Sequence, residues 1–263
     1  MSTPEALRLY CKTLRLPTIL HALTDTVQRA EQESWTYEQL LLTLFEQELE
    51  GRRQRRIGRL LKLAQLPPDK TLAQFDLQRL PRRVQRLLPK LCEGGFADRA
   101  ENILFFGLPG TGKSHAAAAV GYELVYLGYS VLFSPTFRLV GRLLRAKRDY
   151  ELERELRRLD RFQVVILDDI GYVQQSQEEM EVLFTFLAER YERRSVIITS
   201  NLVFSEWERI FKNPLTTAAA IDRVVHHSTI IEFGKEMTSM RAEEAARRQR
   251  QLQISEKSGY AED

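Results

Sequence analysis

Residues Gly107–Ser114 are the feature that most restricts what this chain can fold into. They read GLPGTGKS and match the pattern G-x-x-x-x-G-K-[ST] without a mismatch. An apolar run, Ile103–Phe106, precedes them, and an alanine-rich stretch, Ala116–Val120, follows them. Phosphate binding requires this order of strand, loop and helix, because the N–H groups of the loop and of the helix N-terminus then face one anion. The sequence therefore predicts a nucleoside triphosphate site.

The positions of this loop have separate expected roles in binding ATP and Mg²⁺. The Lys113 ammonium can reach the β- and γ-phosphates, and the Ser114 hydroxyl is an expected ligand of Mg²⁺. His115 follows the loop directly and is interpreted as part of the helix start rather than as a catalyst. The predicted ATP-binding residues are Gly107, Pro109, Gly110, Thr111, Gly112, Lys113, Ser114 and His115.

Two carboxylates follow the apolar run Val164–Leu167. A core strand that ends in an acidic turn is common, but after a phosphate loop the pattern indicates a Walker B element. Asp168 is then expected to hold Mg²⁺, and Asp169 to orient or deprotonate the attacking water. Asp169 is shorter than the glutamate usual in many such ATPases. A protein that binds ATP and hardly hydrolyses it therefore stays open as an alternative.

Two further positions carry side chains suited to a γ-phosphate. Asn201 follows the β-branched run Ser195–Thr199 and could hydrogen-bond the phosphate or the water, or it could merely cap the strand. Arg223 could act as an arginine finger on a neighbouring subunit, although its spacing alone favours an exposed or ion-paired helix residue. The predicted catalytic residues are Lys113, Asp168, Asp169, Asn201 and Arg223, and the predicted metal ligands are Ser114 and Asp168.

The neighbouring residues His226 and His227 are predicted to bind no metal. Both fall in the helical stretch Pro214–His226 or directly after it. Adjacent positions of a helix point in different directions, so two such side chains cannot face one ion. No carboxylate lies at a spacing typical of a zinc site either.

Apolar, β-branched segments alternate with helical stretches after the loop. This alternation predicts an α/β fold, a three-layer P-loop domain with a five-stranded parallel sheet whose carboxyl-terminal strand ends share one edge. Residues 1 to about 65 are predicted to be helical, with Thr36 and Gln39 as a capping box. The predicted domains are a helical N-terminal domain for oligomerisation or DNA binding (1–70), an ATPase domain (71–241) and a charged tail (242–263). The expected strands are Asn102–Phe106, Ser130–Ser134, Gln163–Leu167, Ser195–Thr199 and Thr229–Glu232.

Basic residues are concentrated before the phosphate loop. Residues 1–100 hold 17 Lys and Arg against 12 Asp and Glu, whereas the remainder holds 22 against 24. A basic helix face could neutralise a DNA backbone, or it could be a solvated face partly paired with acids such as Glu48. A second basic set follows the second strand, although Glu151, Glu153 and Glu155 come close behind it. The predicted DNA-binding residues are Arg52, Arg55, Arg59, Lys62, Arg138, Arg142 and Arg145.

The rest of the composition indicates a cytoplasmic protein without a membrane partner. No segment is apolar over the length needed to span a bilayer, and the first residues lack a signal-peptide pattern. Cys11 and Cys92 are isolated in the sequence, which favours a reducing compartment over a disulfide framework.

These motifs together resemble those of the IstB/DnaC-like AAA+ ATPases. The resemblance rests on the phosphate loop, Asp168–Tyr172, Thr199–Asn201 and Ala220–His227, and the N-terminal pattern is similar to that of IstB transposition helpers. It implies a AAA+ fold, assembly with ATP as a homo-oligomer, double-stranded DNA binding, stimulation of a transposase encoded by the same element, and the arginine-finger role for Arg223. Where relatives often carry Ser-Tyr-Arg, this chain has Glu236–Arg241, so Arg241 is only a candidate nucleotide sensor. A replicative-helicase loader of the DnaC type is the alternative.

Overall fold

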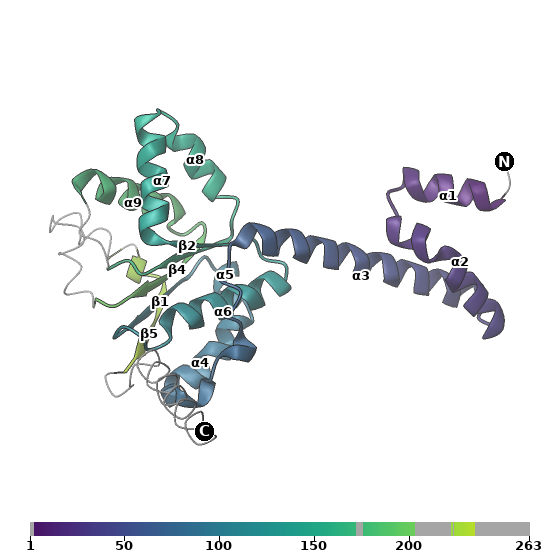
Figure 1. Cartoon of the computed structure of the whole chain (residues 1–263), viewed down its shortest axis with the longest axis horizontal. Helices are drawn as coiled ribbons and strands as arrows, with labels where there is room; N and C mark the ends of the chain where they lie inside the picture. Colours follow the sequence, from purple (N-terminus) through teal and green to yellow (C-terminus); the bar gives the residue numbers. More distant parts are fainter. Residues whose placement is uncertain (1–2, 172–175, 203–221, 223, 235–263) are drawn as a thin grey trace, which may run out of the picture. The chain divides into compact units, whose positions relative to one another are not determined.

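The computed structural model describes residues 3–171, 176–202, 222 and 224–234 of the chain (Figure 1). The chain divides into two compact units, residues 1–59 and residues 60–263. The division falls inside one continuous helix, α3 (Tyr37–Ala64). The start of the ATPase domain near residue 71 stays a prediction, as does the tail from residue 242, which lies outside the described residues.

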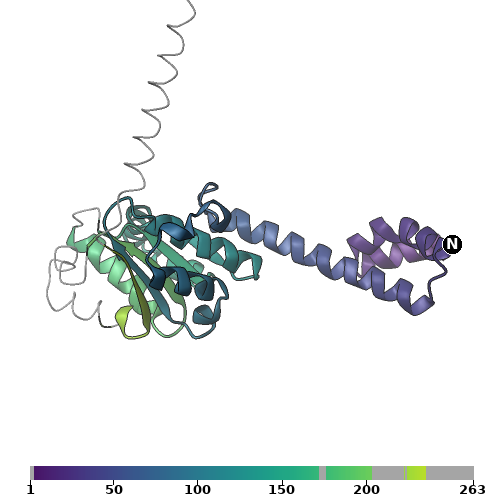
Figure 2. The ribbon, with the colours of Figure 1, turned by 90° about the horizontal axis from the view of Figure 1, so that it is seen from below.

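The first unit is built from helices α1 (Thr3–Thr13), α2 (Pro17–Gln32) and the first part of α3, which lie side by side in both views (Figures 1 and 2). The predicted capping box opens α3, since the Thr36 N–H donates to Gln39 Oε1 at 2.8 Å and the Gln39 N–H to Thr36 Oγ1 at 3.2 Å. Proline at the first position of α2 sacrifices no hydrogen bond there. The small core of this unit is made of Cys11, Ile19 and Leu44, with Leu16, Leu20, Leu23 and Leu40 packed around it.

A buried carboxylate, that of Glu48 on α3, fixes the start of α2. Glu48 Oε2 accepts hydrogen bonds from the Thr18 N–H at 2.8 Å and the Ile19 N–H at 3.2 Å. Its other oxygen is ion-paired with Arg52 at 3.0 Å and Arg55 at 3.1 Å. Burial raises the pKa of Glu48, but the hydrogen bonds from Arg52 and the two N–H groups outweigh it, so the pKa is lowered overall. Glu48 therefore serves as an N-cap supplied by another helix.

The second unit contains a five-stranded parallel sheet in the order β2-β3-β4-β1-β5. Each predicted strand is confirmed to within a residue or so at either end. Such strands are covered on both faces, which is why they read as continuous apolar runs. The bounds are β1 (Asn102–Gly107), β2 (Val131–Pro135), β3 (Val164–Asp168), β4 (Ser195–Ser200) and β5 (Ser228–Phe233).

Helices cover both faces of the sheet and make three layers (Figure 1). One face carries α4 (Arg82–Cys92) and α6 (Lys113–Tyr126), with the short α5 (Gly95–Asp98) nearby. The other carries α7 (Thr136–Arg148), α8 (Leu152–Leu159) and α9 (Gln177–Arg190), whose apolar side chains pack with those of β2, β3 and β4 into one cluster. The segment before the sheet contains two short 3-10 helices, Leu72–Gln74 and Leu77–Arg79. The predicted α/β class is therefore confirmed.

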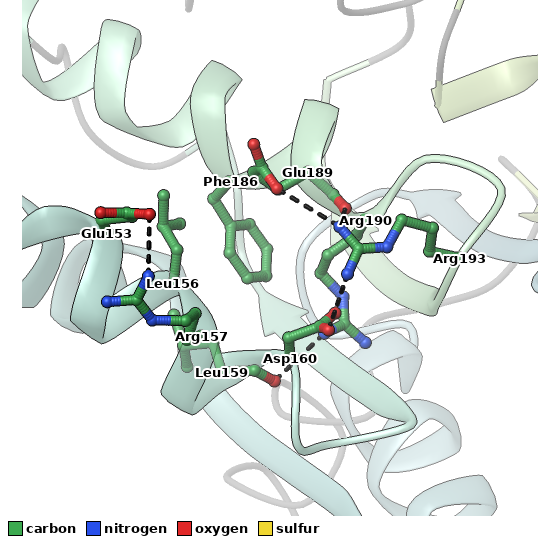
Figure 3. Close-up of a pocket in the computed structure, with 9 residues that line it drawn as sticks. All are labelled: Glu153, Leu156, Arg157, Leu159, Asp160, Phe186, Glu189, Arg190 and Arg193. Atoms are coloured by element: carbon green, nitrogen blue, oxygen red, sulfur yellow. Dashed lines mark hydrogen bonds and ion pairs between the residues drawn. The ribbon is translucent and has the colours of Figure 1, made fainter.

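The amino-terminal edge of the sheet is held by a buried arginine. Arg190, only 2% exposed, donates to the carbonyl oxygens of Leu159, Phe162, Gln163 and Ser195. Burial lowers the pKa of its guanidinium to about 9. Figure 3 shows the pocket beside it, which encloses about 190 Å³ between α8 and α9 and is rimmed by the ion pairs Glu153–Arg157 and Asp160–Arg193. This pocket lies at the opposite strand ends from the phosphate loop.

None of the described helices combines the length and the apolar character needed to cross a membrane.

Candidate nucleotide site

The phosphate loop connects β1 to α6 and depends on glycine at two positions. Gly107 has φ 152°, and a Cβ there would approach the carbonyl oxygen of Phe233, at the end of β5, to 2.5 Å. Gly112 has φ 94° and is the N-cap of α6, so the N–H groups of the first turn open towards the loop. The Thr111 hydroxyl donates to the Leu108 carbonyl at 2.9 Å and closes the loop from inside.

Lys113 lies across this loop. Its ammonium donates to the carbonyl oxygens of Gly107 and Leu108, both at 2.8 Å, and the residue is 8% exposed. The ammonium is thus held within the curve of the loop, where a charged phosphate oxygen is a stronger acceptor than either carbonyl. Ser114 is the next residue of α6 and is partly buried. The cradle formed by these residues fits the triphosphate that the motif predicts.

One hydroxyl on β4 contacts both acidic residues at the end of β3, the carboxylate of Asp168 and the backbone N–H of Asp169. Thr199 Oγ1 donates to Asp168 Oδ1 at 2.7 Å and accepts from the Asp169 N–H at 2.8 Å. The Thr136 hydroxyl also donates to the Asp168 carbonyl oxygen at 3.0 Å. Asp169 is exposed and has φ 61°, a left-handed conformation that aspartate tolerates better than most residues. Thr199 therefore fixes the orientation of the Asp168 carboxylate and the position of the Asp169 backbone.

Asn201 follows β4, the strand that lies between β1 and β3. Its Oδ1 atom is buried and has no hydrogen-bond partner among the described residues. The side chain lies against Gly171, where any Cβ would collide with it. A buried amide oxygen without a partner is costly, so it fits a site completed by a bound water, or by a phosphate if the amide is turned to donate.

His115 contacts the segment that precedes the sheet. Its ring stacks on Phe75 with centroids 4.5 Å apart, and its Nε2 lies 2.9 Å from the Thr71 carbonyl oxygen. Burial lowers the pKa of the imidazole. About two turns further along α6, the Tyr122 hydroxyl donates to the Pro67 carbonyl oxygen at 3.1 Å. The helix of the phosphate loop thus holds residues 67–75 at two points.

Sequence reasoning gave Thr199 no role, although it lies in one of the motifs. The signal that could have found it is the register of two parallel strands. Leu167 pairs with Ile198, so the next residues, Asp168 and Thr199, come opposite each other. This register is visible only once β3 and β4 are known to be neighbours.

The predicted DNA-binding residues divide into two groups. Arg52 and Arg55 are ion-paired with the buried Glu48, and the half-buried Arg142 lies 2.6 Å from Glu155. Burial lowers the pKa of Arg142. The side chains of Arg59, Lys62, Arg138 and Arg145 are exposed, and their role in DNA binding stays a prediction.

Three predictions near the end of the chain have different outcomes. Arg223 and Arg241 lie outside the described residues. His226 and His227 do not continue the helix as the sequence predicted, because both lie in the turn after Val225. Their ring centroids are 4.2 Å apart, and ligand atoms of both come within 4.8 Å of a Glu192 carboxylate oxygen. The argument that they cannot face one ion was therefore wrong, since it assumed a continuous helix.

Comparison with known proteins gives consistent family matches. Residues 10–248 match the family described as IstB-like ATP binding protein. An insertion sequence ATP-binding protein of Sinorhizobium fredii is 43% identical over 90% of this chain and 80% of its own length. Another from Pseudomonas aeruginosa is 37% identical over 84% of this chain and 83% of its own length.

Two solved structures share the fold at low sequence identity. AMPPCP-bound DnaA from Aquifex aeolicus matches with a TM-score of 0.55 and 17% identity over 66% of this chain, which spans about half (53%) of DnaA. The DnaC helicase loader matches with a TM-score of 0.54 and 17% identity over 64% of this chain and 98% of its own. At such identities the likeness concerns the AAA+ fold alone.

Proposed function

This chain belongs to the IstB-like ATP-binding protein family, and from that premise we propose that it is an ATPase that assembles on duplex DNA and assists the transposase of the same insertion sequence. In this proposal the assembly marks the target site, and contact with the transposase triggers hydrolysis and release. The relatives named as insertion sequence ATP-binding proteins support the biological setting. A cytoplasmic location goes with such a role.

The observation that carries the ATPase part is the meeting of three elements at one edge of the sheet. Lys113 follows β1, Asp168 ends β3, and Asn201 follows the strand between them. Mg²⁺, when bound, would neutralise charge on the phosphates from a site made by the Ser114 hydroxyl and the Asp168 carboxylate. Lys113 would exchange its two carbonyl acceptors for phosphate oxygens. Lys113, Asp168 and Asn201 would thus all act at the carboxyl-terminal edge of the sheet, where β1, β3 and β4 end.

The remaining polar groups would act on the water. Asp169 would accept its proton as it attacks the γ-phosphorus, and Asn201 would fix its position. Thr199 would hold the Asp168 carboxylate in one orientation while donating no proton to the reaction. The left-handed backbone of Asp169 sets the direction of its short side chain.

Assembly would follow if Arg223 of one subunit reaches the γ-phosphate bound to the next. ATP then binds at a heterologous interface, and each bound nucleotide stabilises the contact between two subunits. DNA would be held by the exposed cations Arg59, Lys62, Arg138 and Arg145 through phosphate contacts. Arg52, Arg55 and Arg142 would contribute less, because each already faces a carboxylate.

The coupling of nucleotide to assembly can be tested by sizing the full chain with duplex DNA. With ATP we expect a large, defined species, and Lys113→Ala should remain in small species. Lys90→Ala changes an exposed lysine on α4 and should assemble like the wild type. Assembly of Lys113→Ala with ATP would refute the coupling. A preference for single-stranded DNA would favour the helicase-loader alternative.

The trans role of Arg223 can be tested by mixing two inactive variants. Lys113→Ala lacks the loop lysine and Arg223→Ala lacks the finger, which is worth about 1,000-fold or more in rate in other phosphoryl-transfer enzymes. In a mixture, an Arg223→Ala subunit can still bind ATP and a Lys113→Ala subunit can supply the arginine, so interfaces between the two kinds hold both intact groups and phosphate release should reappear. If the mixture stays as inactive as its components, Arg223 does not act between subunits.

A further inference from the structure

Three side chains with metal-binding groups converge at the amino-terminal edge of the sheet, away from the nucleotide. Glu192 lies in the turn between α9 and β4, and His226 and His227 lie in the turn before β5. Their nearest ligand atoms all lie within 4.8 Å of one another, and all three side chains are exposed. We propose that these residues form a binding site for a divalent transition metal of the zinc class.

The spacing of the ligand atoms suits a tetrahedral ion. His227 Nε2 and Glu192 Oε1 are 3.3 Å apart. Bonds of about 2.0 to 2.1 Å in a tetrahedral zinc site place neighbouring ligand atoms about 3.3 Å apart. The ring of His226 meets that of His227 edge to face, with 65° between their planes. The nearest ligand atom of His226 lies within 4.8 Å of the other two, so a small shift of its ring would complete a three-ligand site with one position left for water.

A hydroxyl beside the cluster orients one of the imidazoles. Tyr191 Oη lies 2.9 Å from His226 Nδ1. When Nδ1 carries the proton and donates it to this oxygen, the lone pair of Nε2 is available to the ion. A hydrogen bond from the second ring nitrogen is what fixes the orientation of a metal-bound histidine. Tyr191 directly precedes Glu192, so one turn supplies both a ligand and the group that orients another.

The backbone also favours this use of Glu192. Its φ is 57°, in the left-handed region where glycine or asparagine is ordinary and a glutamate is strained. A longer side chain at such a position places its carboxylate where the chain reverses, against His227.

Buried hydrogen bonds hold the two turns in register. The Asn102 N–H donates to the His227 carbonyl at 2.7 Å, and its side-chain amide donates to the Val224 carbonyl at 3.2 Å. Asn102 Oδ1 accepts from the Val196 N–H of β4 at 2.9 Å. One side chain at the start of β1 thus ties β4 to the turn that carries both histidines, and a metal ion would join the same two segments across β1.

The chemistry of the donors separates this site from the Mg²⁺ site of the nucleotide. Two imidazoles and one carboxylate suit zinc, nickel or copper ions, whereas Mg²⁺ prefers oxygen ligands and keeps its waters. The cluster lies at the amino-terminal strand ends, and Lys113 and Asp168 lie at the carboxyl-terminal ends. A metal bound here would therefore stabilise the sheet edge without entering the reaction.

The test is a titration of the full, tag-free and chelator-treated chain with zinc chloride by calorimetry, and with cobalt chloride by absorption. We expect one ion per chain, a cobalt spectrum of low coordination number, and a rise of several degrees in the thermal midpoint with zinc. A wild-type chain that binds no zinc at equimolar concentration, or shows only the spectrum of aqueous cobalt, would overturn the proposal.

Variants identify the ligands. His227→Ala and Glu192→Gly should each weaken zinc binding at least tenfold and abolish the rise in midpoint. Glu192→Gly relieves the left-handed backbone, so its metal-free form should be at least as stable as the wild type. His21→Ala, which removes an exposed histidine on α2, should bind zinc normally. Equal zinc affinity in the wild type and in the ligand variants would refute the assignment even if the chain binds an ion elsewhere.

Discussion

The helical unit and the sheet unit use apolar side chains in opposite ways. In residues 60–263 a large buried cluster fills the space between the sheet and α7, α8 and α9. Among the described residues of 1–59, the buried cluster consists of Cys11, Ile19 and Leu44. Many large apolar side chains of this unit are exposed instead, namely Leu7, Leu9, Tyr10, Leu14, Tyr37, Leu41, Leu42, Phe45 and Leu49.

Three of the exposed side chains on α3, those of Leu42, Phe45 and Leu49, share one face of the helix. Leu40 and Leu44 point into the small core, and Leu42, Phe45 and Leu49 point away from it, in agreement with the helical period. Contiguous exposed apolar surface of this kind usually marks an interaction site. From this comparison we predict that the helical unit presents a surface for other subunits, whereas the sheet unit carries the phosphate loop and the carboxylates of the nucleotide site.

The largest expected effect would come from the exposed face of α3. Leu42→Lys keeps α3 intact, because Glu38 and Glu46 lie one turn away on either side and can pair with the new ammonium. If this face contacts another subunit at a hot spot, the substitution should weaken ATP-dependent assembly by about 100-fold or more. Sedimentation with ATP and duplex DNA measures this, and the ATP affinity of the isolated subunit should not change.

Leu127→Lys is the matched control for this substitution. Leu127 is 54% exposed on the sheet unit, Leu42 is 60% exposed on the helical unit, and each has a glutamate four residues before it. The added lysine is attracted to the negative DNA backbone in both variants, so repulsion between the protein and DNA cannot explain a loss of assembly. Equal assembly by the two variants would show that the exposed face of α3 contributes no more to assembly than an exposed leucine of the sheet unit.

The second effect concerns Thr199, which belongs to the sheet unit alone. Thr199→Val keeps the shape of the side chain and the β-branched character of β4 but removes the hydroxyl that links Asp168 and Asp169. Loss of a group that orients a metal ligand typically lowers activity between about 10- and 100-fold. We expect both the rate of phosphate release and the affinity for Mg²⁺ to fall by this factor, while assembly on DNA with ATP persists.

Thr185→Val controls for the loss of a hydroxyl in the same unit. The Thr185 hydroxyl donates only to a carbonyl oxygen of its own helix, α9, at 2.8 Å. This variant should hydrolyse ATP at the wild-type rate. Unchanged hydrolysis in Thr199→Val would show that the two acids need no orientation by β4.

Much of the sheet unit could be predicted from sequence because its signals are local. Apolar runs such as Val164–Leu167 mark buried parallel strands, and functional groups such as Asp168 directly follow them. What depends on neighbouring strands could not be read in the same way. The double contact of Thr199 requires the β3–β4 register, and the approach of His226 to Glu192 requires that the helix end at Val225.

The helical unit was harder to predict because its decisive contacts are between helices. The sequence showed arginines near Glu48 but not that the carboxylate caps α2 across 30 residues. The same contact changes the interpretation of the basic helix face, since Arg52 and Arg55 are ion-paired with the buried carboxylate of Glu48. Propensity and periodicity place a residue on a face of its own helix, and they leave its partner on another helix undetermined.

The third effect tests this polar contact. Glu48→Gln removes the charge that accepts from two N–H groups and faces two arginines, and should lower the free energy of unfolding of the helical unit by about 2 kcal/mol. Glu50→Gln alters an exposed glutamate on the same helix and should change little. Hydrogen exchange of residues 1–59 separates this unit from the sheet. Equal protection in the two variants would contradict the capping role.

The pH dependence of the helical unit follows from the same carboxylate. The pKa of Glu48 is lowered in the folded chain from an ordinary value of 4.5. Its contribution is therefore fully present above that value and is lost as the pH falls through the lowered pKa. Protection of residues 1–59 should fall on acidification below pH 4.5 in the wild type. Glu48→Gln should lack this component, which assigns the titration to one group.

The smallest expected effect distinguishes cations that face solvent from those that face acids. Arg138 and Arg145 are exposed on α7, whereas Arg142 lies between them in sequence and is paired with Glu155. If α7 contacts duplex DNA, Arg138→Ala and Arg145→Ala should each weaken binding a few-fold and lower the salt slope by about 0.9 per lost phosphate contact. Arg142→Ala should leave the slope unchanged and lower stability instead, because it removes the nearer partner of Glu155 and leaves only Arg158, at 3.7 Å, beside that largely buried carboxylate. An equal loss of slope in all three variants would mean that DNA competes successfully with Glu155 for Arg142. Ion pairing would then not distinguish the arginines of α7 that bind DNA from those that do not.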